Sequence, residues 1–525
     1  MPTFVRLFRW CFSWRMLRRG LIGLAALLTL IALCYAVVNW RGQRAWAAYK
    51  TKLDARGIRL HLKAFIPPPV PDDQNFAMTP FLAPLFDFNP TPLKPGESRW
   101  RDTNGFKRVS EFATVVGSGP SEGRQGWRAG QKTELAEWLR HLQHEKNKSA
   151  TPTNAQPAGV DDKAVAAAVM EAFQEFRPVL EELREASHRP HARFNVRYDE
   201  ENPWAILLPH LAVVNRTSRV LEVRAAAELA LGKTEAACED VNFILYLADS
   251  VKEEPFLISY LLRVAVMDQA LQAVWEGLAG RQWTEAQLQD FQARLRDLTL
   301  IRDLEQPMGA ERAAGDETIA HLRERPDGAR LFTELGGGNN FVDALLFHLA
   351  PRGWIYQEQV SYHQIYDQFI LPGYDPAAGM IHPAIIEASA KSFEKLFGDT
   401  AANCWEHRLM ARLLLPAVSR CYQKSARAQT GVNEAILACA LERHRLANGR
   451  VPDSLEALVP RFLPKLPPDV LTGEPLKYRR LDDGQFLIYS VGWNEKDDGG
   501  VVVSTGKNKV LDAAQGDWVW QYPGK

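Results

Sequence analysis

The longest uninterrupted apolar run lies close to the N-terminus. Residues 21 to 40 carry no charge, and from Leu21 to Val38 the only clearly polar side chain is Thr29. Because a helix rises about 1.5 Å per residue, a run of this length spans a hydrocarbon core of about 30 Å. Tryptophan and tyrosine rings flank the run on both sides, as is typical of the two water interfaces of a bilayer. The pattern predicts one transmembrane helix over residues 21 to 40.

A cleaved signal peptide is the alternative interpretation of this run. The apolar regions of signal peptides have about 7–15 residues, which is shorter than the run found here. Ala45-Trp46-Ala47 imitates a cleavage site, but Arg41 and Arg44 stand just before it, where signal peptides rarely carry charge. We therefore expect the helix to be retained as an anchor, with the lipid bilayer as its partner.

The basic residues around this helix bear on its orientation. Residues 1 to 20 contain five arginines and no acid, and five Lys/Arg follow the helix up to Arg56, with Asp54 among them. Cytoplasmic flanks of membrane helices carry an excess of Lys and Arg. We expect a cytoplasmic tail at residues 1 to 20, an anchor in the inner membrane, and a main domain on the periplasmic side.

Proline changes the pattern beyond the anchor. A helix is expected to continue from residue 41 to about Gly57, and residues 65 to 100 then hold nine prolines. Proline fixes φ and removes a backbone donor, so this stretch is neither a helix nor a central strand. We interpret it as a strap that lies on the folded body and is held by Phe76, Phe81, Leu85 and Phe86; a disordered stalk is the alternative. With the polar stretch 144–163 it completes a membrane-proximal region at residues 41 to 160.

Residues 161 to 424 show mostly helical periodicity, with apolar positions three to four residues apart. Gly232 and Gly280 are expected to end helices, and Thr284 with Gln287 has the spacing of a capping box. The stretch 225–240 resembles one tetratricopeptide-type repeat of an α-solenoid. The predicted fold class is therefore mainly α, with a body of helical hairpins.

The last hundred residues change character again. A long amphipathic helix is expected over residues 425 to 447, and the runs 476–481 and 485–491 are rich in β-formers around a turn at Asp482-Asp483-Gly484. A loop dense in acids and glycines follows at 490–500. These features predict a small α+β module at residues 425 to 525.

This module resembles the globular domain of type II secretion major pseudopilins, the general secretion pathway protein G type. That family has a long helix, a Gly-x-x-Pro entry, a short leucine-rich helix, a proline–aspartate step, a hairpin, and a final loop that ends in Gly-Gly. The positions that carry the resemblance are Gly449, Pro452, Leu455 to Leu458, Pro468-Asp469, Gly484, Ser490, Gly492, Asn494, Gly499-Gly500 and Asp517-Trp518.

The resemblance implies a metal site, since the family binds calcium in the final loop. Asn494 stands where the family has a ligand aspartate, Asp497 and Asp498 lie beside it, and Asp517 would close the site. Calcium takes six to eight oxygen ligands from such loops. A solvated Asp/Gly turn is the alternative interpretation.

The chain also departs from this family. Cleavage after Gly20 would place Ala25 at the fifth position, where a pseudopilin has a glutamate, and the pilin-like module lies nearly 400 residues further on. We therefore interpret the N-terminal helix as a tether and not as a filament-forming helix.

Charge and motifs limit the remaining function classes. The 63 basic and 63 acidic residues balance, which argues against nucleic acid as the partner because phosphate binding needs a basic surface. There is no His-Glu-x-x-His motif, and paired acids such as Glu239-Asp240 occupy helix positions that usually face water. We expect no enzyme but a cell-envelope protein that binds or scaffolds an envelope partner. The alternatives are a pseudopilus-associated component of type II secretion and an undetected envelope hydrolase.

Overall fold

A computed structural model of the chain describes most of the predicted elements. The described residues are 14–89, 98–116, 119, 126–146, 161–200, 202–324, 350–397, 406–415, 420–481, 484–506 and 510–522. Most of the basic tail, most of the polar stretch 144–163 and the turn residues Asp482 and Asp483 lie outside them. The described part is mainly helical with small antiparallel sheets, which confirms the predicted fold class at that level.

The chain divides into two compact units, each assembled from segments far apart in the sequence. Unit 1 comprises Met1–His61, Arg312–Ile370 and Lys391–Pro416, and unit 2 comprises Leu62–Glu311, Leu371–Ala390 and Ala417–Lys525. The division falls within two helices, α12 (Glu305–Glu324) and α16 (Pro383–Phe397).

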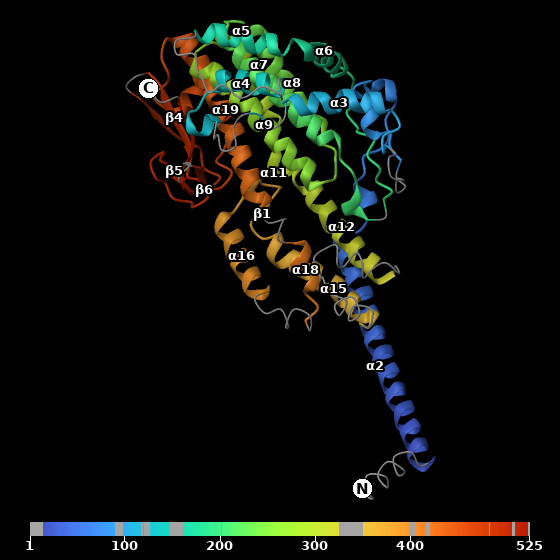
Figure 1. Cartoon of the computed structure of the whole chain (residues 1–525). Coiled ribbons are helices and arrows are strands. Elements are labelled where there is room, and N and C mark those ends of the chain that lie inside the picture. The colour runs from blue at the N-terminus through green and yellow to red at the C-terminus, as the bar shows by residue number, and fades with distance from the viewer. Residues whose placement is uncertain are drawn as a thin grey trace, which may run out of the picture. The chain divides into compact units, whose positions relative to one another are not determined.

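Unit 1 is built on α2 (Trp14–Ala55), a single helix of 42 residues that is labelled in Figure 1. Leu21, Leu27 and Val37 are each 53% to 59% exposed. Further along the same helix, Trp46 and Leu53 are buried in a core cluster with Leu60. The N-terminal half of α2 therefore exposes apolar side chains, and its C-terminal half is part of the folded core of unit 1.

The partner of α2 within unit 1 is α15 (Arg352–Ile365), which packs along it. Gly42 and Gly353 meet at the crossing, where a Cβ on Gly42 would overlap the carbonyl oxygen of Gly353 and one on Gly353 would overlap that of Val38. The Gly353 amide donates to Asn39 Oδ1 at 2.7 Å. The two backbones therefore touch at a point where only glycine fits.

The chain leaves α15 through a π-helix, η8 (Tyr366–Ile370). The last helix of unit 1 is α18 (Leu409–Leu414), and Glu358 holds its start because the carboxylate accepts the Leu409 and Met410 amides at 3.2 and 2.9 Å. Burial raises the pKa of Glu358 to about 7, and the two amide bonds oppose that rise.

Unit 2 begins with the proline-rich strap. Phe76, Phe81, Leu85 and Phe86 are at most 7% exposed, which confirms their predicted burial and contradicts a disordered stalk for the described part of the strap. Proline breaks the strap into short turns of 3₁₀ helix before the first long helix of the unit. These elements are η1 (Leu62–Phe65), η2 (Asp72–Gln74), η3 (Phe76–Met78), η4 (Ala83–Phe86) and α3 (Thr103–Val116).

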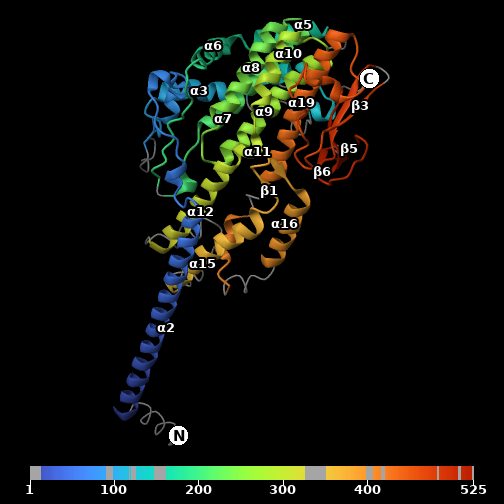
Figure 2. The ribbon, with the colours of Figure 1, turned by 180° about the vertical axis from the view of Figure 1, so that it is seen from behind.

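Long helices form the centre of unit 2, and α7, α8 and α9 lie side by side in both views (Figures 1 and 2). The predicted hairpin turn is confirmed at Gly232, which has φ +75°, and the capping box of Thr284 and Gln287 is also confirmed. The elements are η5 (Gly126–Ala129), α4 (Leu135–Lys146), α5 (Asp162–Ala172), η6 (Gln174–Phe176), α6 (Arg177–Ala186), η7 (Pro203–Ala205), α7 (His210–Ala230), α8 (Thr234–Ser250), α9 (Leu257–Ala279), α10 (Glu285–Arg296) and α11 (Leu300–Asp303).

One helix of this centre corrects a prediction. Asp240 on α8 was expected to face water, but it is fully buried and accepts hydrogen bonds from Arg184 and from Arg224, the latter at 3.0 Å. These arginines come from α6 and α7, which enclose the polar side of α8. A buried carboxylate needs such partners because desolvation without them is costly.

Two helices among the described residues, α2 and α9, are long and apolar enough to cross a membrane. They differ in how much of the apolar window is buried. In α9 the apolar window is 67% buried, as in a core helix, whereas none of the corresponding window of α2 is buried.

The C-terminal segment joins the core of unit 2 through α19 (Cys421–Asn448), which packs against α9, α10 and α11 and ends at Gly449 with φ +78°. The strands β3, β5 and β6 lie beside this helix in Figure 2. β4 pairs antiparallel with β3 and β7, β5 with β6, and β1 with β2. The elements are β1 (Tyr374–Asp375), β2 (Met380–Ile381), η9 (Leu455–Leu458), β3 (Lys477–Arg480), β4 (Phe486–Ser490), β5 (Val502–Thr505), β6 (Val510–Gly516) and β7 (Trp518–Trp520).

Candidate functional site

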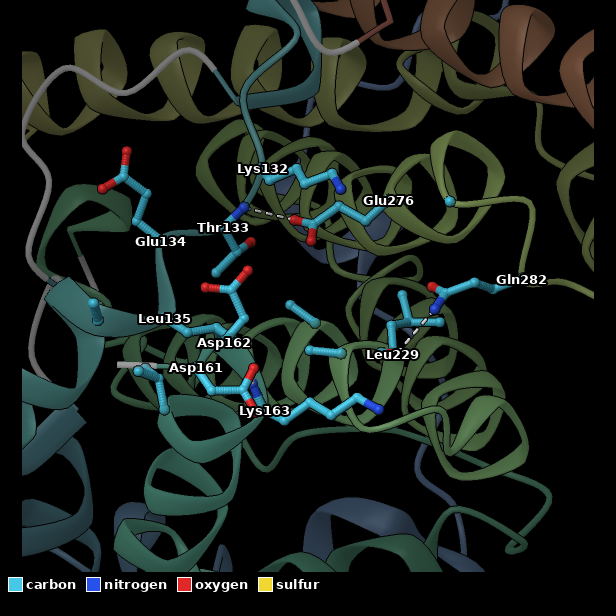
Figure 3. A pocket seen from close by; sticks show the side chains of 15 residues that line it. Lys132, Thr133, Glu134, Leu135, Asp161, Asp162, Lys163, Leu229, Glu276 and Gln282 are labelled. Atoms are coloured by element: carbon cyan, nitrogen blue, oxygen red, sulfur yellow. Dashed lines mark hydrogen bonds between the residues drawn. The ribbon is translucent and has the colours of Figure 1, made fainter. Parts of the chain in front are cut away.

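A pocket of about 660 Å³ opens in unit 2 among α4, α5, α7 and α9 (Figure 3). Its volume is in the range of small-molecule and peptide-side-chain sites. The polar residues that line it are Lys132, Thr133, Glu134, Asp161, Asp162, Lys163, Glu276 and Gln282, and the apolar ones are Leu135, Ala136, Val165, Ala226, Leu229, Ala230 and Gly280.

Two side chains of α9 hold one rim of this pocket. Glu276 Oε1 accepts hydrogen bonds from the Thr133 amide and from Gln272 Nε2, both at 2.8 Å. Gln272 Nε2 also donates to the Gln131 carbonyl at 3.0 Å, and Gln272 Oε1 accepts the Trp127 amide at 2.6 Å. The segment that precedes α4 is therefore hydrogen-bonded to α9 at Trp127, Gln131 and Thr133. These bonds fix the position of this rim before a ligand binds.

The opposite rim is formed by the start of α5 and the end of α7. Asp161 caps α5 by accepting the Lys163 amide at 3.4 Å, and Gln282 Nε2 donates to the Leu229 carbonyl at 3.0 Å (Figure 3). Alanine and leucine of α7 supply the apolar floor. Charges of both signs above an apolar floor suit a ligand with donors, acceptors and apolar groups, such as a polypeptide segment.

Glu222 is a buried carboxyl on α7. Burial raises its pKa from 4.5 to about 7, the Arg219 charge opposes the rise, and the Glu276 and Asp268 charges add to it. Arg219 Nη1 donates to Glu222 Oε2 at 2.8 Å. Arg219 is thus the hydrogen-bonding partner of this carboxyl, whereas the charges of Glu276 and Asp268 disfavour its ionisation.

Replacing Glu222 with glutamine is expected to stabilise the protein above neutral pH. Because the folded-state pKa is raised, the native state binds more protons between about pH 4.5 and 7, and the stabilisation from the protonated form is lost as pH rises through that window. The shift corresponds to a loss of about 3 kcal/mol by roughly pH 8. Urea unfolding of the full chain in detergent at about pH 5 and pH 8 measures it, with the exposed Glu171→Gln as control. A stabilisation of equal size at both pH values would contradict the assignment.

The four residues predicted to bind calcium lie in one loop region of unit 2. Asn494 Nδ2 donates to Asp498 Oδ2 at 3.0 Å, and Asp498 is linked to Asp517 because its amide donates to Asp517 Oδ1 at 3.3 Å. Asp497 Oδ1 accepts from the Tyr489 hydroxyl at 3.1 Å. The side chains of Asn494 and Asp498 meet, Asp517 meets the backbone of Asp498, and the Asp497 carboxylate contacts the Tyr489 hydroxyl.

The oxygens of this loop already have donors. Asp517 is 2% exposed, and its Oδ2 accepts the Gly500 and Val501 amides at 2.6 and 3.3 Å. Lys477 Nζ lies 4.0 Å from Asp497 Oδ2. Within the described residues, no group of three or more His, Cys, Asp or Glu side chains is arranged to hold a metal ion. A bound calcium would have to replace the Lys477 ammonium and turn the Asn494 amide, so calcium binding stays a prediction.

Thermal unfolding of the full chain in detergent tests that prediction. Binding to the native state alone adds about 2.7 kcal/mol at a ligand concentration a hundred times the Kd. Millimolar calcium should therefore raise the unfolding temperature relative to chelator, and Asp497→Asn should remove the rise. Equal unfolding temperatures with calcium and with chelator would exclude the site, and an equal effect of magnesium would indicate ionic strength alone.

Unit 1 contains a buried polar network that the sequence did not indicate. Arg312 Nε donates to His363 Nδ1 at 2.9 Å, and His363 Nε2 lies 3.0 Å from Asp316 Oδ1. Burial lowers the pKa of His363, which favours the neutral ring with its proton on Nε2, facing Asp316. Trp46 stacks on the same ring with centroids 5.6 Å apart.

The network continues from Arg312 to Asp367 and Arg56. Arg312 Nη1 contacts Asp367 Oδ1 at 2.8 Å, and Arg56 Nη1 reaches Asp367 Oδ2 at 2.5 Å. Hydrogen bonds from both arginines lower the pKa of Asp367 against the opposing effect of burial. His363 is fully buried and meets protein groups on both ring nitrogens. We therefore interpret the role of this network as structural: its hydrogen bonds and ion pairs hold α2 against α12, α15 and η8 within unit 1.

No family model, no curated protein and no solved structure matches the chain. The pseudopilin resemblance of residues 425 to 525 accordingly stays a prediction.

Proposed function

We propose that this protein is a membrane-tethered cell-envelope protein that acts by binding or scaffolding an envelope partner. The tether is the exposed apolar half of α2, residues 21 to 38, in the inner membrane with the N-terminus inside. The body lies on the periplasmic side and presents the pocket between α4, α5, α7 and α9 to a polypeptide segment of the partner.

The observation that supports the tether is the continuity of α2. Trp46 belongs to the core cluster with Leu53, and Asn39 and Gly42 contact Gly353 of α15. Cleavage after Ala47, as in a signal peptide, would remove all three contacts from the core of unit 1. Retention of the helix keeps both its apolar half in the bilayer and its packed half in the fold.

The experiment for the tether uses the full chain in a bacterial inner membrane. We expect the protein to resist alkaline carbonate extraction and to keep its own N-terminus. Cleavage near Ala47 with release of the body would refute the tether. Cleavage after Gly20 would instead favour the pseudopilus-associated alternative.

The experiment for the binding role places a photocrosslinking amino acid at Lys132, on the rim of the pocket, and at the exposed Glu171 of α5 as a matched control. A binding protein should give one defined adduct from position 132 in intact cells and none from 171. Adducts from both positions, or from neither, would count against the pocket as the binding site. Hydrolysis of a crosslinked partner would revive the enzyme alternative.

A further inference from the structure

A second pocket in unit 2, of about 300 Å³, lies among η5, α9 and α19 and is dominated by cations. Arg128, Lys424 and Arg427 line it together with a single acid, Asp268. The rest of the lining is apolar and comprises Leu261, Val264, Ala265, Met267 and Leu271 of α9 and Ala428 of α19. The pocket thus has a basic side and an apolar wall.

Arg128 is held rigidly in this pocket. Its Nη1 pairs with Asp268, its Nη2 donates to the Arg427 carbonyl at 3.4 Å, and its guanidinium stacks 4.2 Å from the centre of the Trp127 ring. The Trp127 indole also donates to Asp268 Oδ1 at 3.1 Å. Asp268 Oδ1 therefore already has two donors, Arg128 and Trp127.

Arg427 has no such ion pair among the described residues. Its Nε is buried and makes no hydrogen bond in the structure. Burial and the Arg128 charge lower the pKa of the Arg427 guanidinium to about 10, against the weaker opposing charges of Asp268, Glu434 and Asp512. An unpaired donor of this kind costs free energy, since the hydrogen bond it made to water is not replaced.

The nearest buried acid on the same helix offers little compensation. Glu434 is 2% exposed, and burial raises its pKa well above the ordinary value even though Arg128 and Arg427 oppose the rise. Glu434 does not line the pocket, so the three cations of the pocket face one carboxylate, that of Asp268. An anion from outside the chain would balance the remaining positive charge.

We propose that this pocket binds a small organic anion, a carboxylate or a phosphate monoester that carries an apolar group. The anion pairs with Arg427 and Lys424 beside the fixed Arg128, because guanidinium groups form charge-assisted hydrogen bonds with such oxyanions. The apolar group lies against the wall formed by α9, where its removal from water adds to the affinity. This site is separate from the pocket assigned above to the partner polypeptide.

The experiment uses the full chain in non-ionic detergent and follows binding by isothermal titration and by the unfolding temperature. The probes are benzoate, phenyl phosphate, benzyl alcohol and inorganic phosphate. We expect benzoate or phenyl phosphate to bind about tenfold or more tightly than benzyl alcohol, since one charge-assisted hydrogen bond contributes at least that much. The comparison of benzoate with phenyl phosphate shows whether the pocket prefers a carboxylate or a phosphate. Inorganic phosphate should bind more weakly than phenyl phosphate, because it has no apolar group to pack against α9.

Variants separate this site from unspecific binding. Arg427→Gln should weaken the preferred anion about tenfold or more, whereas Arg420→Gln, an exposed arginine at the start of the same helix, should leave it unchanged. If Arg427→Gln does not fold, Lys424→Gln, at an exposed position of the lining, serves instead. Equal binding of benzoate, phenyl phosphate and benzyl alcohol, or equal affinity of the variant and the parent chain, would overturn the proposal.

Discussion

Replacing Gly42 with valine should unfold or loosen unit 1, at a cost of about 3 kcal/mol, the upper end for an overpacked core. A side chain at this position would overlap the backbone of Gly353, and backbone cannot move aside as a flexible side chain can. The contact joins α2 to α15, so its loss exposes α15. Limited trypsin digestion of the full chain in detergent should show earlier cleavage at Arg352, and the unfolding temperature should fall.

The matched control for this prediction lies in the same helix. Gly23→Val introduces the same side chain with the same helix propensity, but nothing lies within 4 Å of a Cβ at that position. It should therefore leave digestion and unfolding unchanged. Equal effects of the two substitutions would show that the loss comes from helix propensity and not from the crossing with α15.

Replacing Arg312 with methionine is the second change with a large expected effect, a loss of about 3–5 kcal/mol, as for other buried ion pairs that lose one partner. The arginine is 3% exposed, and it binds His363 Nδ1, the Asp367 carboxylate and the face of the Tyr366 ring. Its removal leaves the Nδ1 of His363 without a donor in a dry core. Chemical unfolding with a probe at Trp46, which stacks on His363, measures the loss.

Arg56 provides the control, since it binds the same carboxylate from an exposed position. The Arg56 side chain is 47% exposed, and surface ion pairs contribute at most about 1 kcal/mol. Arg56→Met should therefore cost much less than Arg312→Met, even though its distance to Asp367 is shorter. A larger loss for Arg56→Met would contradict the role given to burial.

Local patterns in the sequence predicted much of the secondary structure, and particular residues show why. The Thr284 and Gln287 capping box and the Gly232 turn depend on neighbours within a few residues, so they could be found from spacing alone. The two β-rich runs on either side of Gly484 pair as β3 and β4 for the same reason. The burial of Phe76 and Phe81 followed from their hydrophobicity in a stretch too rich in proline for a helix.

The sites depend on contacts that spacing does not reveal. Asp240 was placed in water because its own helix shows a polar face there, and only the packing of α6 and α7 encloses it. Arg128 and Arg427 are 299 residues apart, yet they share one pocket. The metal prediction used residues of one loop and Asp517, but the partners that the structure gives Asp517 are backbone amides.

The N-terminal helix separates what the sequence determined from what only the tertiary structure decided. An apolar run of eighteen to twenty residues is helical and seeks a non-aqueous environment whatever follows it, so its existence and its extent could be read from composition. Residues 41 to 55 were expected to continue the helix, but their mixture of charged and apolar side chains does not show which of them are buried. Only the segment Arg312–Ile370, which returns from far along the chain to unit 1, supplies Gly353, His363 and Asp367 as partners for Gly42, Trp46 and Arg56. Burial is a property of the assembled core, and that core forms between residues about 300 positions apart.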